Sequence, residues 1–324
     1  MTSIAFIFPG QGSQSVGMGA ALAAASPAAA AVFEQADAAL ADAGLGEPLS
    51  RLAWEGPAEL LNLTENAQPA LLATSIAYLA ALRERWAARQ AEGGPAAPEP
   101  RFAAGHSMGQ YSAFVAAGAL SLADGVRLVR ARGQLMQASG AGREGRMAAL
   151  IGLDDARLPE LIEGASAHGI FGVANRNAPG QVVVSGERAA VEAGLELARS
   201  LGARRAIELP VSVAAHSPLM ADAAERMAAI LADVTFHNPH PGGLANADAR
   251  PITTAAAARA ELVEHLTAGV DWIRAVETMS AAGVTTFIEV GPGRVLAGLT
   301  SRIAGEATVL ATDAPNNPDG LAVP

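Results

Sequence analysis

The stretch that most constrains the fold of this chain is FAAGHSMGQYSAF, residues 102–114, in which Ser107 stands between Gly105 and Gly109. A short apolar segment, RFAAG, leads into the serine, and a segment of helical composition follows it. Between a strand and a helix, the pattern G-x-S-x-G is typical of a nucleophile elbow, in which glycines let strand and helix approach a strained serine. The N-terminus of such a helix adds free N–H groups and partial positive charge beside the hydroxyl. The stretch therefore predicts an α/β fold with a reactive Ser107, the alternative being an ordinary turn serine.

The rest of the chain supplies further elements of a parallel α/β domain. The segment IAFIF at residues 4–8 is apolar throughout, as expected of a strand buried on both faces of a parallel sheet. Residues 67–90 carry a long apolar helical face, with Pro69 predicted in the first turn. Further helices are expected at residues 20–43, 122–139, 218–231 and 255–266, and a further strand at residues 285–290. These elements predict a large, hydrolase-like parallel-sheet domain.

Residues 143–208 break this pattern. Segments typical of a strand, a helix, two strands around the turn NAPG, a second helix and a last strand follow one another there. The order βαββαβ is typical of a ferredoxin-like module. We therefore expect a discontinuous large domain, residues 1–142 and 209–312, with an inserted ferredoxin-like small domain, and a disordered tail at residues 313–324.

The residues that the chain lacks limit its chemistry. None of the 324 residues is cysteine, which excludes thiol catalysis, disulfides and cysteine-ligated metal. Lysine is also absent, which excludes a Schiff base, a Walker A lysine and a Ser–Lys dyad. A formal net charge of -10 argues against nucleic acid as a partner. We expect a cytoplasmic enzyme, because the sequence shows no signal peptide and no run near the ~20 apolar residues that cross a membrane.

A reactive serine needs a base, and here the base is expected among six histidines. His216 follows the apolar segment AIELPVSV and precedes Ser217 and Pro218, which suit the start of a helix. Ligands of an open α/β sheet bind beyond the ends of its strands, so we assign His216 as the base. Because the base must be neutral, we expect acylation to fall as the pH drops through about 6.5, the ordinary pKa of histidine.

The other histidines fit the role of base less well. His106 lies on the elbow itself and is assigned to substrate binding instead. His168, at a helix end in the insert, and His237 and His240, in the loop FHNPHPGG, are expected on the surface. No further ligands accompany the last two, so no metal site is predicted. His265, in LVEHLTAG, is expected either to be structural or to lie behind the reacting groups.

Six motifs occur in order along the chain: FPGQGSQ, AQPALLATS, GHSMGQYSA, NAPGQVVVSG, AAHSPLM and EVGPGRVL. Together they resemble the malonyl-CoA:acyl carrier protein transacylases and the related acyltransferase domains of fatty acid and polyketide synthesis, over about residues 4–303. The resemblance implies ping-pong transfer: a serine takes malonyl from coenzyme A as an ester and passes it to the phosphopantetheine thiol of an acyl carrier protein. It implies no cofactor, and the loops GQGSQSVG and GPG lack the spacing of a nucleotide-binding motif.

The resemblance also implies roles for individual residues. Ser107 matches the nucleophile and His216 the general base. Gln11 and Met108 match the residues whose backbone N–H groups form the oxyanion hole, the pair of donors that stabilises the tetrahedral intermediate.

Other positions match the substrate-binding residues of the family. Arg132, in VRARGQLMQ, matches the arginine that binds the malonyl carboxylate, a task that suits a guanidinium because it forms two parallel hydrogen bonds. Its neighbours Arg127 and Arg130 are expected on the helix surface. Gln68 matches a glutamine that lines the site, and Asn177 is placed near the path of coenzyme A.

Three positions depart from the usual family pattern. Gln110 stands where the elbow continues with glutamate. His265 stands where relatives carry a glutamine whose backbone carbonyl orients the base, a contact that any residue can make. Ala215 replaces the Phe or Ser that often accompanies malonyl or methylmalonyl preference, which leaves the extender unit open.

Other functions compatible with this chain are a trans-acting polyketide acyltransferase with another extender unit, a serine acyl hydrolase and a non-catalytic module that docks a carrier protein. A hydrolase has no use for Arg132, and a docking module needs neither Ser107 nor His216. We expect a monomer whose partners are malonyl-CoA and an acyl carrier protein, with no nucleic acid or membrane partner. Candidates for the surface that meets the acidic carrier protein are Arg199, Arg204 and Arg205.

Overall fold

The computed structural model describes residues 3–139, 144–211 and 213–313. Its first part contains β1 (Ile4–Phe8), α1 (Ala20–Ala25), α2 (Pro27–Leu40), α3 (Leu49–Glu55), α4 (Ala58–Leu61), α5 (Thr64–Ala91), β2 (Pro100–Gly105), α6 (Gly109–Ala116) and α7 (Leu122–Ser139). The insert contains β3 (Gly145–Ile151), α8 (Leu158–Ser166), β4 (Phe171–Ala178), β5 (Gln181–Glu187), α9 (Arg188–Ser200) and β6 (Arg205–Glu208). The last part contains α10 (Ala221–Ala232), β7 (Gly243–Leu244), β8 (Pro251–Ile252), α11 (Ala255–Glu264), β9 (Val270–Asp271), α12 (Trp272–Ala281), β10 (Thr286–Glu289), α13 (Val295–Ile303) and β11 (Thr308–Ala311).

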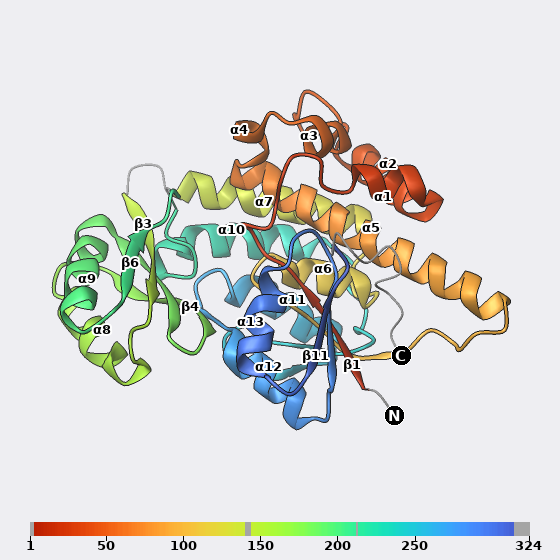
Figure 1. The fold of residues 1–324 in the computed structure, drawn as a ribbon. Helices are drawn as coiled ribbons and strands as arrows, with labels where there is room; N and C mark the ends of the chain where they lie inside the picture. The colour runs from red at the N-terminus through yellow and green to blue at the C-terminus, as the bar shows by residue number, and fades with distance from the viewer. Residues whose placement is uncertain (1–2, 140–143, 212, 314–324) are drawn as a thin grey trace.

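A parallel sheet with the strand order β11-β10-β1-β2 forms the centre of the large domain (Figure 1). The side chains of β1 alternate between its two faces. Ile4, Phe6 and Phe8 pack with α5 and α6, whereas Ala5 and Ile7 pack with α12 and α13. The sheet is thus the middle of three layers, which explains why its strand is apolar at every position.

The helices α5 and α7 pack against each other and carry α1 to α4 on their outer side (Figure 1). Their approach is close at Gly133 of α7, where a Cβ atom would lie 2.4 Å from the Cα atom of Glu65 in α5. The main chains of the two helices are therefore nearly in contact. This contact fixes the part of α7 that carries Arg132.

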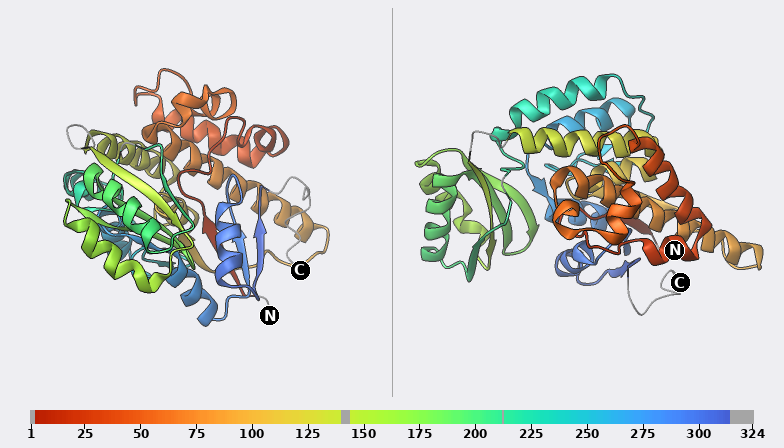
Figure 2. Two further views of the ribbon diagram at one scale, coloured as in Figure 1. Left: turned by 60° about the vertical axis from the view of Figure 1, so that its left-hand side comes forward. Right: turned by 90° about the horizontal axis from the view of Figure 1, so that it is seen from above.

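The insert forms a separate sheet with the order β6-β3-β5-β4 and two helices on one face, beside the large domain (Figure 2). Its strands are antiparallel, and β4 and β5 form a hairpin around the sequence NAPG. Its own core contains Leu150, Leu161, Val184 and Val191. This is the expected ferredoxin-like order. In addition, β9 of the large domain pairs in parallel with β4, with Val270 opposite Asn175.

Some elements differ from the sequence-based expectation. Helix α5 begins at Thr64, so Pro69 stands inside the helix and the prediction of a first-turn proline is wrong. Proline has no N–H to donate to the carbonyl of Glu65, and that carbonyl instead accepts a hydrogen bond of 3.1 Å from Arg130 Nη1. A side chain from α7 thus replaces the hydrogen bond that proline removes.

Hydrogen bonds also hold Asp313, the last residue that the structure describes. Asp313, the first residue of the predicted tail, accepts hydrogen bonds from Tyr78 (2.6 Å) and from the N–H of Gly293 (2.7 Å), so the expectation of disorder is wrong for this residue. Residues 314–324 of that tail, and the predicted domain boundary at residue 142, lie outside the described residues. Among the described helices, none combines the length and hydropathy that a membrane-spanning helix requires.

Candidate active site

Ser107 lies at the sharp turn between β2 and α6. Its φ angle of 52° is left-handed, a conformation that costs a residue with a side chain about 1–2 kcal/mol. A Cβ on Gly105 would lie 1.9 Å from the carbonyl carbon of Gly109, and one on Gly109 would lie 2.2 Å from the oxygen of Phe8. Both glycines are therefore required by close approach, and together they present the serine at the carboxyl end of the sheet.

The side chain of Gln110 stabilises this turn by joining Gly105 to Leu244. Its Oε1 accepts a hydrogen bond of 3.0 Å from the N–H of Gly105, and its Nε2 donates to the carbonyl of Leu244 at 2.9 Å. The residue is fully buried. The position at which the family resemblance implies a glutamate is therefore filled here by an amide that satisfies one donor and one acceptor.

His216 faces Ser107 from the other side of the site, with its Nε2 2.9 Å from Ser107 Oγ. Its Nδ1 lies 2.7 Å from the carbonyl oxygen of His265 and 3.0 Å from that of Ala268. Because carbonyl oxygens only accept, Nδ1 carries the proton and Nε2 offers a lone pair to the serine hydroxyl. The imidazole is thus oriented to take a proton from Ser107.

Burial is the largest cause that lowers the pKa of His216. The charge of Arg132 and the electrostatic effect of the nearby His106 lower it further, to about 3. The expectation that this histidine titrates near 6.5 is therefore wrong, because a cation in this site would lose its hydration and meet another cation. The neutral, proton-accepting form is the stable one at and well below neutral pH.

Arg132 reaches the serine from α7 and is almost completely buried. Its Nη1 donates to Gln68 Oε1 at 2.8 Å, and its Nη2 donates to Ser107 Oγ at 3.2 Å. Its Nε has no hydrogen-bond partner among the described residues. Burial lowers the pKa of this guanidinium. The structure thus places a desolvated cation, held by Gln68, directly beside the serine hydroxyl.

The neighbouring arginines of α7 differ from each other. Arg127 is exposed, as expected, and donates to the carbonyl of Ala39. Arg130 is buried, so the prediction of a surface residue is wrong. It is held inside because its guanidinium bonds the carbonyl of Glu65 and the side chain of Asn66 at the start of α5.

The loop after β1 brings Gln11 to the serine. A Cβ on Gly10 would lie 2.6 Å from the carbonyl oxygen of His106, so this loop runs directly against the elbow. The side chain of Gln11 donates to Thr64 at the start of α5 (3.2 Å). Among the described residues, the backbone N–H groups of Gln11 and Met108 have no acceptor, so both remain available to a ligand.

His106 and Asn177 line the same site from opposite domains. His106 Nε2 lies 2.8 Å from Asn177 Oδ1, so the elbow is joined to β4 of the small domain. Burial lowers the pKa of His106. The two residues therefore close one side of the site without adding charge.

These groups surround a cavity of about 690 Å³ between the two domains. Its polar lining includes Ser107, Arg132, His216 and the glycine-rich loop at residues 10–12. Its apolar lining includes Met136, Met147, Val183, Leu209, Val211, Val213, Ala215, Leu296 and Leu299. A cavity of this kind suits a small acyl group that carries one negative charge.

Sequence reasoning missed Asn246, which lies in the turn between β7 and β8. Its Oδ1 accepts a hydrogen bond of 2.8 Å from the N–H of Ser107. Its loop sequence, GGLANADA, carries no motif that would single it out.

Of the remaining histidines, His168, His237 and His240 are exposed as expected. The described residues contain no group of three or more side chains suited to hold a metal ion.

Comparisons with known proteins agree with this arrangement. A model of the acyl transferase domain matches residues 5–312. The malonyl CoA-acyl carrier protein transacylase of Escherichia coli (strain K12) is 45% identical over 316 residues, which cover 98% of this chain and 97% of that protein. The protein of the same name from Bacillus subtilis (strain 168) is 42% identical, covering 97% of this chain and 95% of that one.

Solved structures are similar as well. The acyl-carrier-protein-S-malonyltransferase from Bartonella henselae superposes with a TM-score of 0.90 at 42% identity, covering 99% of this chain and 97% of that one. A malonyl-transacylase in complex with its type II PKS acyl-carrier protein gives a TM-score of 0.87 at 39% identity, covering 99% and 98%. With a family model matched over nearly its whole length and relatives above 40% identity, this chain belongs to the acyl transferase domain family, in the group of malonyl-CoA:acyl carrier protein transacylases.

Proposed function

We propose that this enzyme transfers a malonyl group from coenzyme A to the phosphopantetheine thiol of an acyl carrier protein, through an ester on Ser107. The single observation that carries the choice of acyl group is Arg132, a buried guanidinium whose Nη2 lies 3.2 Å from Ser107 Oγ. A malonyl thioester brings a carboxylate to that charge, and an acetyl thioester does not. The names of the relatives support the same substrate.

In the first half-reaction, Ser107 Oγ attacks the thioester carbonyl while its proton passes to His216 Nε2. The negative charge that develops on the carbonyl oxygen is stabilised by the N–H groups of Gln11 and Met108, and loss of one such donor typically costs ~3 kcal/mol. As the carbon–sulfur bond breaks, the leaving sulfur of coenzyme A takes the proton from His216. The product is malonyl-Ser107.

In the second half-reaction, the carrier thiol gives its proton to His216 and attacks the ester of Ser107. The carbon–oxygen bond then breaks and the proton returns to Ser107 Oγ. In this proposal Arg132 binds the malonyl carboxylate, Gln68 holds the arginine, and His106 and Asn177 border the path of coenzyme A. His265 acts only through its backbone carbonyl, which orients His216.

Intact mass spectrometry tests this proposal. The enzyme is mixed separately with malonyl-CoA, acetyl-CoA and methylmalonyl-CoA, and a holo carrier protein is then added. We expect a malonyl adduct that moves to holo but not to apo carrier protein, and no adduct in Ser107→Ala. An adduct on Ser107→Ala would place the nucleophile elsewhere. A wild-type adduct that is lost as fast without a carrier protein as with one would identify a serine hydrolase. A stronger adduct with methylmalonyl-CoA would assign another extender unit.

We further propose a cytoplasmic monomer that meets the carrier protein through exposed arginines of the small domain. Ser107, His216 and Arg132 all line one cavity of this chain, which supports a monomeric enzyme. Arg199, Arg204 and Arg205 are exposed and available for the docking surface. The division into residues 1–142 with 209–312 and residues 143–208 is part of the same proposal.

A further inference from the structure

Asn246 uses every polar group that it has. It is buried, with 4% of its surface exposed. Its Oδ1 accepts from the N–H of Ser107 (2.8 Å) and its Nδ2 donates to the carbonyl of Gly105 (3.0 Å). Its backbone N–H donates to Glu261 Oε1 (2.7 Å), and its carbonyl accepts from the N–H of Asp271 (2.7 Å). One side chain thus bonds the elbow at Gly105 and at Ser107, on either side of His106.

We propose that Asn246 is a positioning residue that holds Ser107 in its left-handed conformation, and that Glu261 in turn holds Asn246. The inference rests on the proposed function, because it concerns the alignment of the same serine. The φ angle of 52° at Ser107 is unfavourable by itself, so it must be maintained by its surroundings. The two hydrogen bonds from Asn246 act on the residues where the chain turns.

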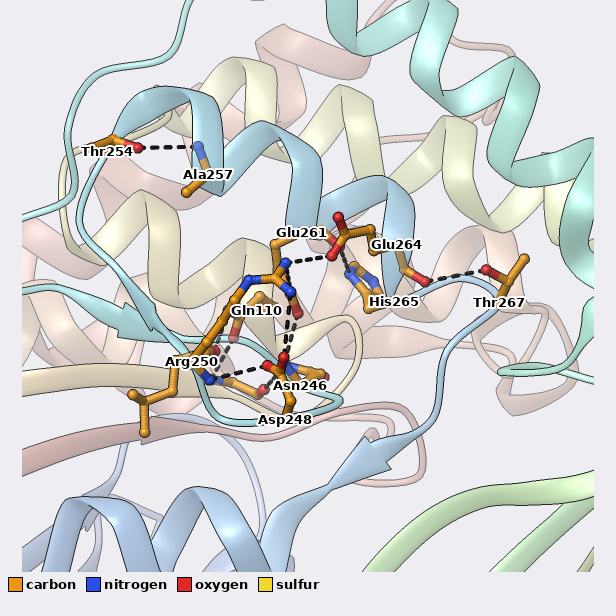
Figure 3. A network of polar contacts seen from close by, with 12 residues as sticks. Gln110, Asn246, Asp248, Arg250, Thr254, Ala257, Glu261, Glu264, His265 and Thr267 are labelled. Atoms are coloured by element: carbon orange, nitrogen blue, oxygen red, sulfur yellow. Dashed lines mark hydrogen bonds and ion pairs between the residues drawn. The ribbon is translucent and has the colours of Figure 1, made fainter. Parts of the chain in front are cut away.

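The two hydrogen bonds of the Asn246 side chain to Gly105 and Ser107 are here called the clamp. Glu261 connects this clamp with the base, His216. It lies on α11, and it is 2% exposed. Its carboxylate accepts from the N–H of Asn246, while its backbone carbonyl accepts from the N–H (3.0 Å) and Nδ1 (2.8 Å) of His265 (Figure 3). The carbonyl of His265 accepts from His216 Nδ1 at 2.7 Å. The end of α11 therefore fixes the position of Ser107 through a side chain and that of His216 through the main chain.

Glu261 is held in place as well. Arg250 Nη2 lies 4.0 Å from its Oε2 and also pairs with Glu264, one turn further along α11 (Figure 3). Burial of the Glu261 carboxyl raises its pKa to about 7. What Asn246 needs from this residue is an acceptor oxygen, which a glutamine amide also offers.

The clamp has a direction, which makes it testable. The N–H of Ser107 requires an acceptor and the carbonyl of Gly105 requires a donor, and an asparagine amide supplies one of each. An aspartate of the same shape would set an oxygen against the carbonyl of Gly105. Because the N–H of Ser107 is already bonded, the oxyanion donors have to come from other residues, in agreement with the roles proposed for Gln11 and Met108.

The test is single-turnover formation of malonyl-Ser107, which separates alignment from folding. The amplitude counts competent enzyme, the rate constant reports alignment, and the malonyl-CoA concentration at half-saturation reports binding. For Asn246→Ala and Asn246→Asp we expect nearly full amplitude, unchanged half-saturation and a rate constant lower by about 100-fold, the effect of a shift of about 1 Å in a reacting group. Asn238→Ala removes the same side chain at the other end of α11, where Asn238 accepts from the N–H of Ala255, and should leave the rate unchanged.

A conservative pair at Glu261 gives an independent result. Glu261→Gln keeps an acceptor for Asn246 and should retain the rate to within about threefold, whereas Glu261→Ala should lose it as Asn246→Ala does. This pair decides the matter if the Asn246 variants fail to fold. A rate constant near the wild-type value in Asn246→Ala, a loss confined to the amplitude, or equal losses in both Glu261 variants would overturn the inference.

A second probe keeps this inference separate from the proposed function. A fluorophosphonate reacts with any serine that a neighbouring base activates, whatever its acyl donor. If wild-type enzyme takes no malonyl but reacts with the fluorophosphonate, the proposed substrate is wrong. The clamp is then supported if Asn246→Ala slows that reaction and refuted if it does not.

Discussion

Arg132 carries its charge in the interior without a carboxylate partner among the described residues. Its partners are the amide of Gln68 and the hydroxyl of Ser107, both of them neutral. A buried cation with only neutral partners is poorly compensated. It therefore attracts an anionic acyl group and disfavours a neutral one, which gives selectivity in both directions.

Replacing this arginine should change which thioester is used. Arg132→Ala removes the partner of the malonyl carboxylate and relieves the unpaired charge that an acetyl group leaves behind. We expect malonyl transfer to fall sharply, acetyl transfer to be kept or raised, and the preference to shift by ~2–4 kcal/mol. The measurement is kcat/KM for the two thioesters in both enzymes. An equal loss on both would make Arg132 a structural residue.

The acid limb of the reaction should lie well below pH 6.5. Acylation needs neutral His216, and burial together with Arg132 and His106 holds the pKa of this histidine to about 3. Acetyl-CoA is the substrate for this measurement, because an acetyl group leaves the charge of Arg132 unpaired. The rate of acylation of wild-type enzyme by acetyl-CoA should stay nearly constant from pH 7 to pH 5. In Arg132→Ala the limb should move upward without reaching 6.5, because burial, the largest cause, remains. A wild-type limb at pH 6.5 in the rate of acetyl-Ser107 formation would contradict this.

Residues that act through their place in a motif were predictable, and those that act through distant contacts were not. Ser107 was chosen because it follows a strand, which β2 confirms. His216 was chosen on the same ground, and that ground is wrong, because β6 ends at Glu208 and belongs to the sheet of the insert. The choice of base still agrees with the geometry, since His216 Nε2 lies 2.9 Å from Ser107 Oγ. Arg130 was expected on the surface because nothing in its own helix shows that Pro69 leaves a carbonyl to be filled. Asn246 was missed because its partner, Ser107, lies 139 residues away.

Among the elements, the pair α5 and α7 positions the charge of the site. Gln68 lies on α5 and Arg132 on α7, and they are joined by a hydrogen bond of 2.8 Å. The distance between the helix axes is set nearby by Gly133, which leaves no room for a Cβ. Helix packing thus decides where the guanidinium lies.

Gly133→Ala should therefore disturb both stability and selectivity. An added methyl group would lie 2.4 Å from the main chain of Glu65, which cannot rotate away. We expect a loss of about 1–3 kcal/mol in the free energy of unfolding, as for other overpacked sites, and a lower kcat/KM for malonyl-CoA. Urea unfolding and steady-state kinetics measure the two effects.

Gly298→Ala in α13 is the matched control for this substitution. A Cβ at that position meets nothing within 4 Å. Since alanine favours helix over glycine, this variant should gain about 0.5–1 kcal/mol. If both variants behave alike, close packing at Gly133 is not the cause.

The βαββαβ insert and the strands around the elbow followed from hydrophobic patterning, because their segments are either continuously apolar or separated by clear turns. The short strands β7, β8 and β9 and the edge strand β11 were not predicted. Two or four residues carry too little periodicity to indicate a strand, and their pairing depends on partners far along the chain.

At the scale of the whole molecule, burying neutral histidines makes stability depend on pH. Burial, with Arg132 and His216 nearby, holds the pKa of His265 well below 6.5 in the folded protein. The unfolded chain takes up a proton near 6.5 that the folded protein refuses. The stability present above pH 6.5 is therefore lost progressively as the pH falls below that value.

His265→Gln should weaken this dependence, since glutamine does not titrate. Below pH 6.5 the free energy of unfolding of the variant should fall less steeply, by up to about 1.4 kcal/mol per pH unit. Urea unfolding between pH 7.5 and pH 5 measures the slopes. His168→Gln, the same substitution at an exposed position, is the control. Parallel slopes in wild type and His265→Gln would show that the buried histidine accepts a proton after all.

The parallel pairing of β9 with β4 bears on how the enzyme meets its substrate. Val270 and Asp271 belong to the large domain, yet they form ladder hydrogen bonds with Asn175 and Arg176 of the small one, and Arg176 also pairs with Asp271 at 3.0 Å. The domains cannot swing apart without breaking these bonds. The entropy cost of ordering the residues around the cavity is therefore borne during folding, and not each time a substrate binds. A preorganised cavity of this kind leaves more of the contact free energy for binding the acyl group.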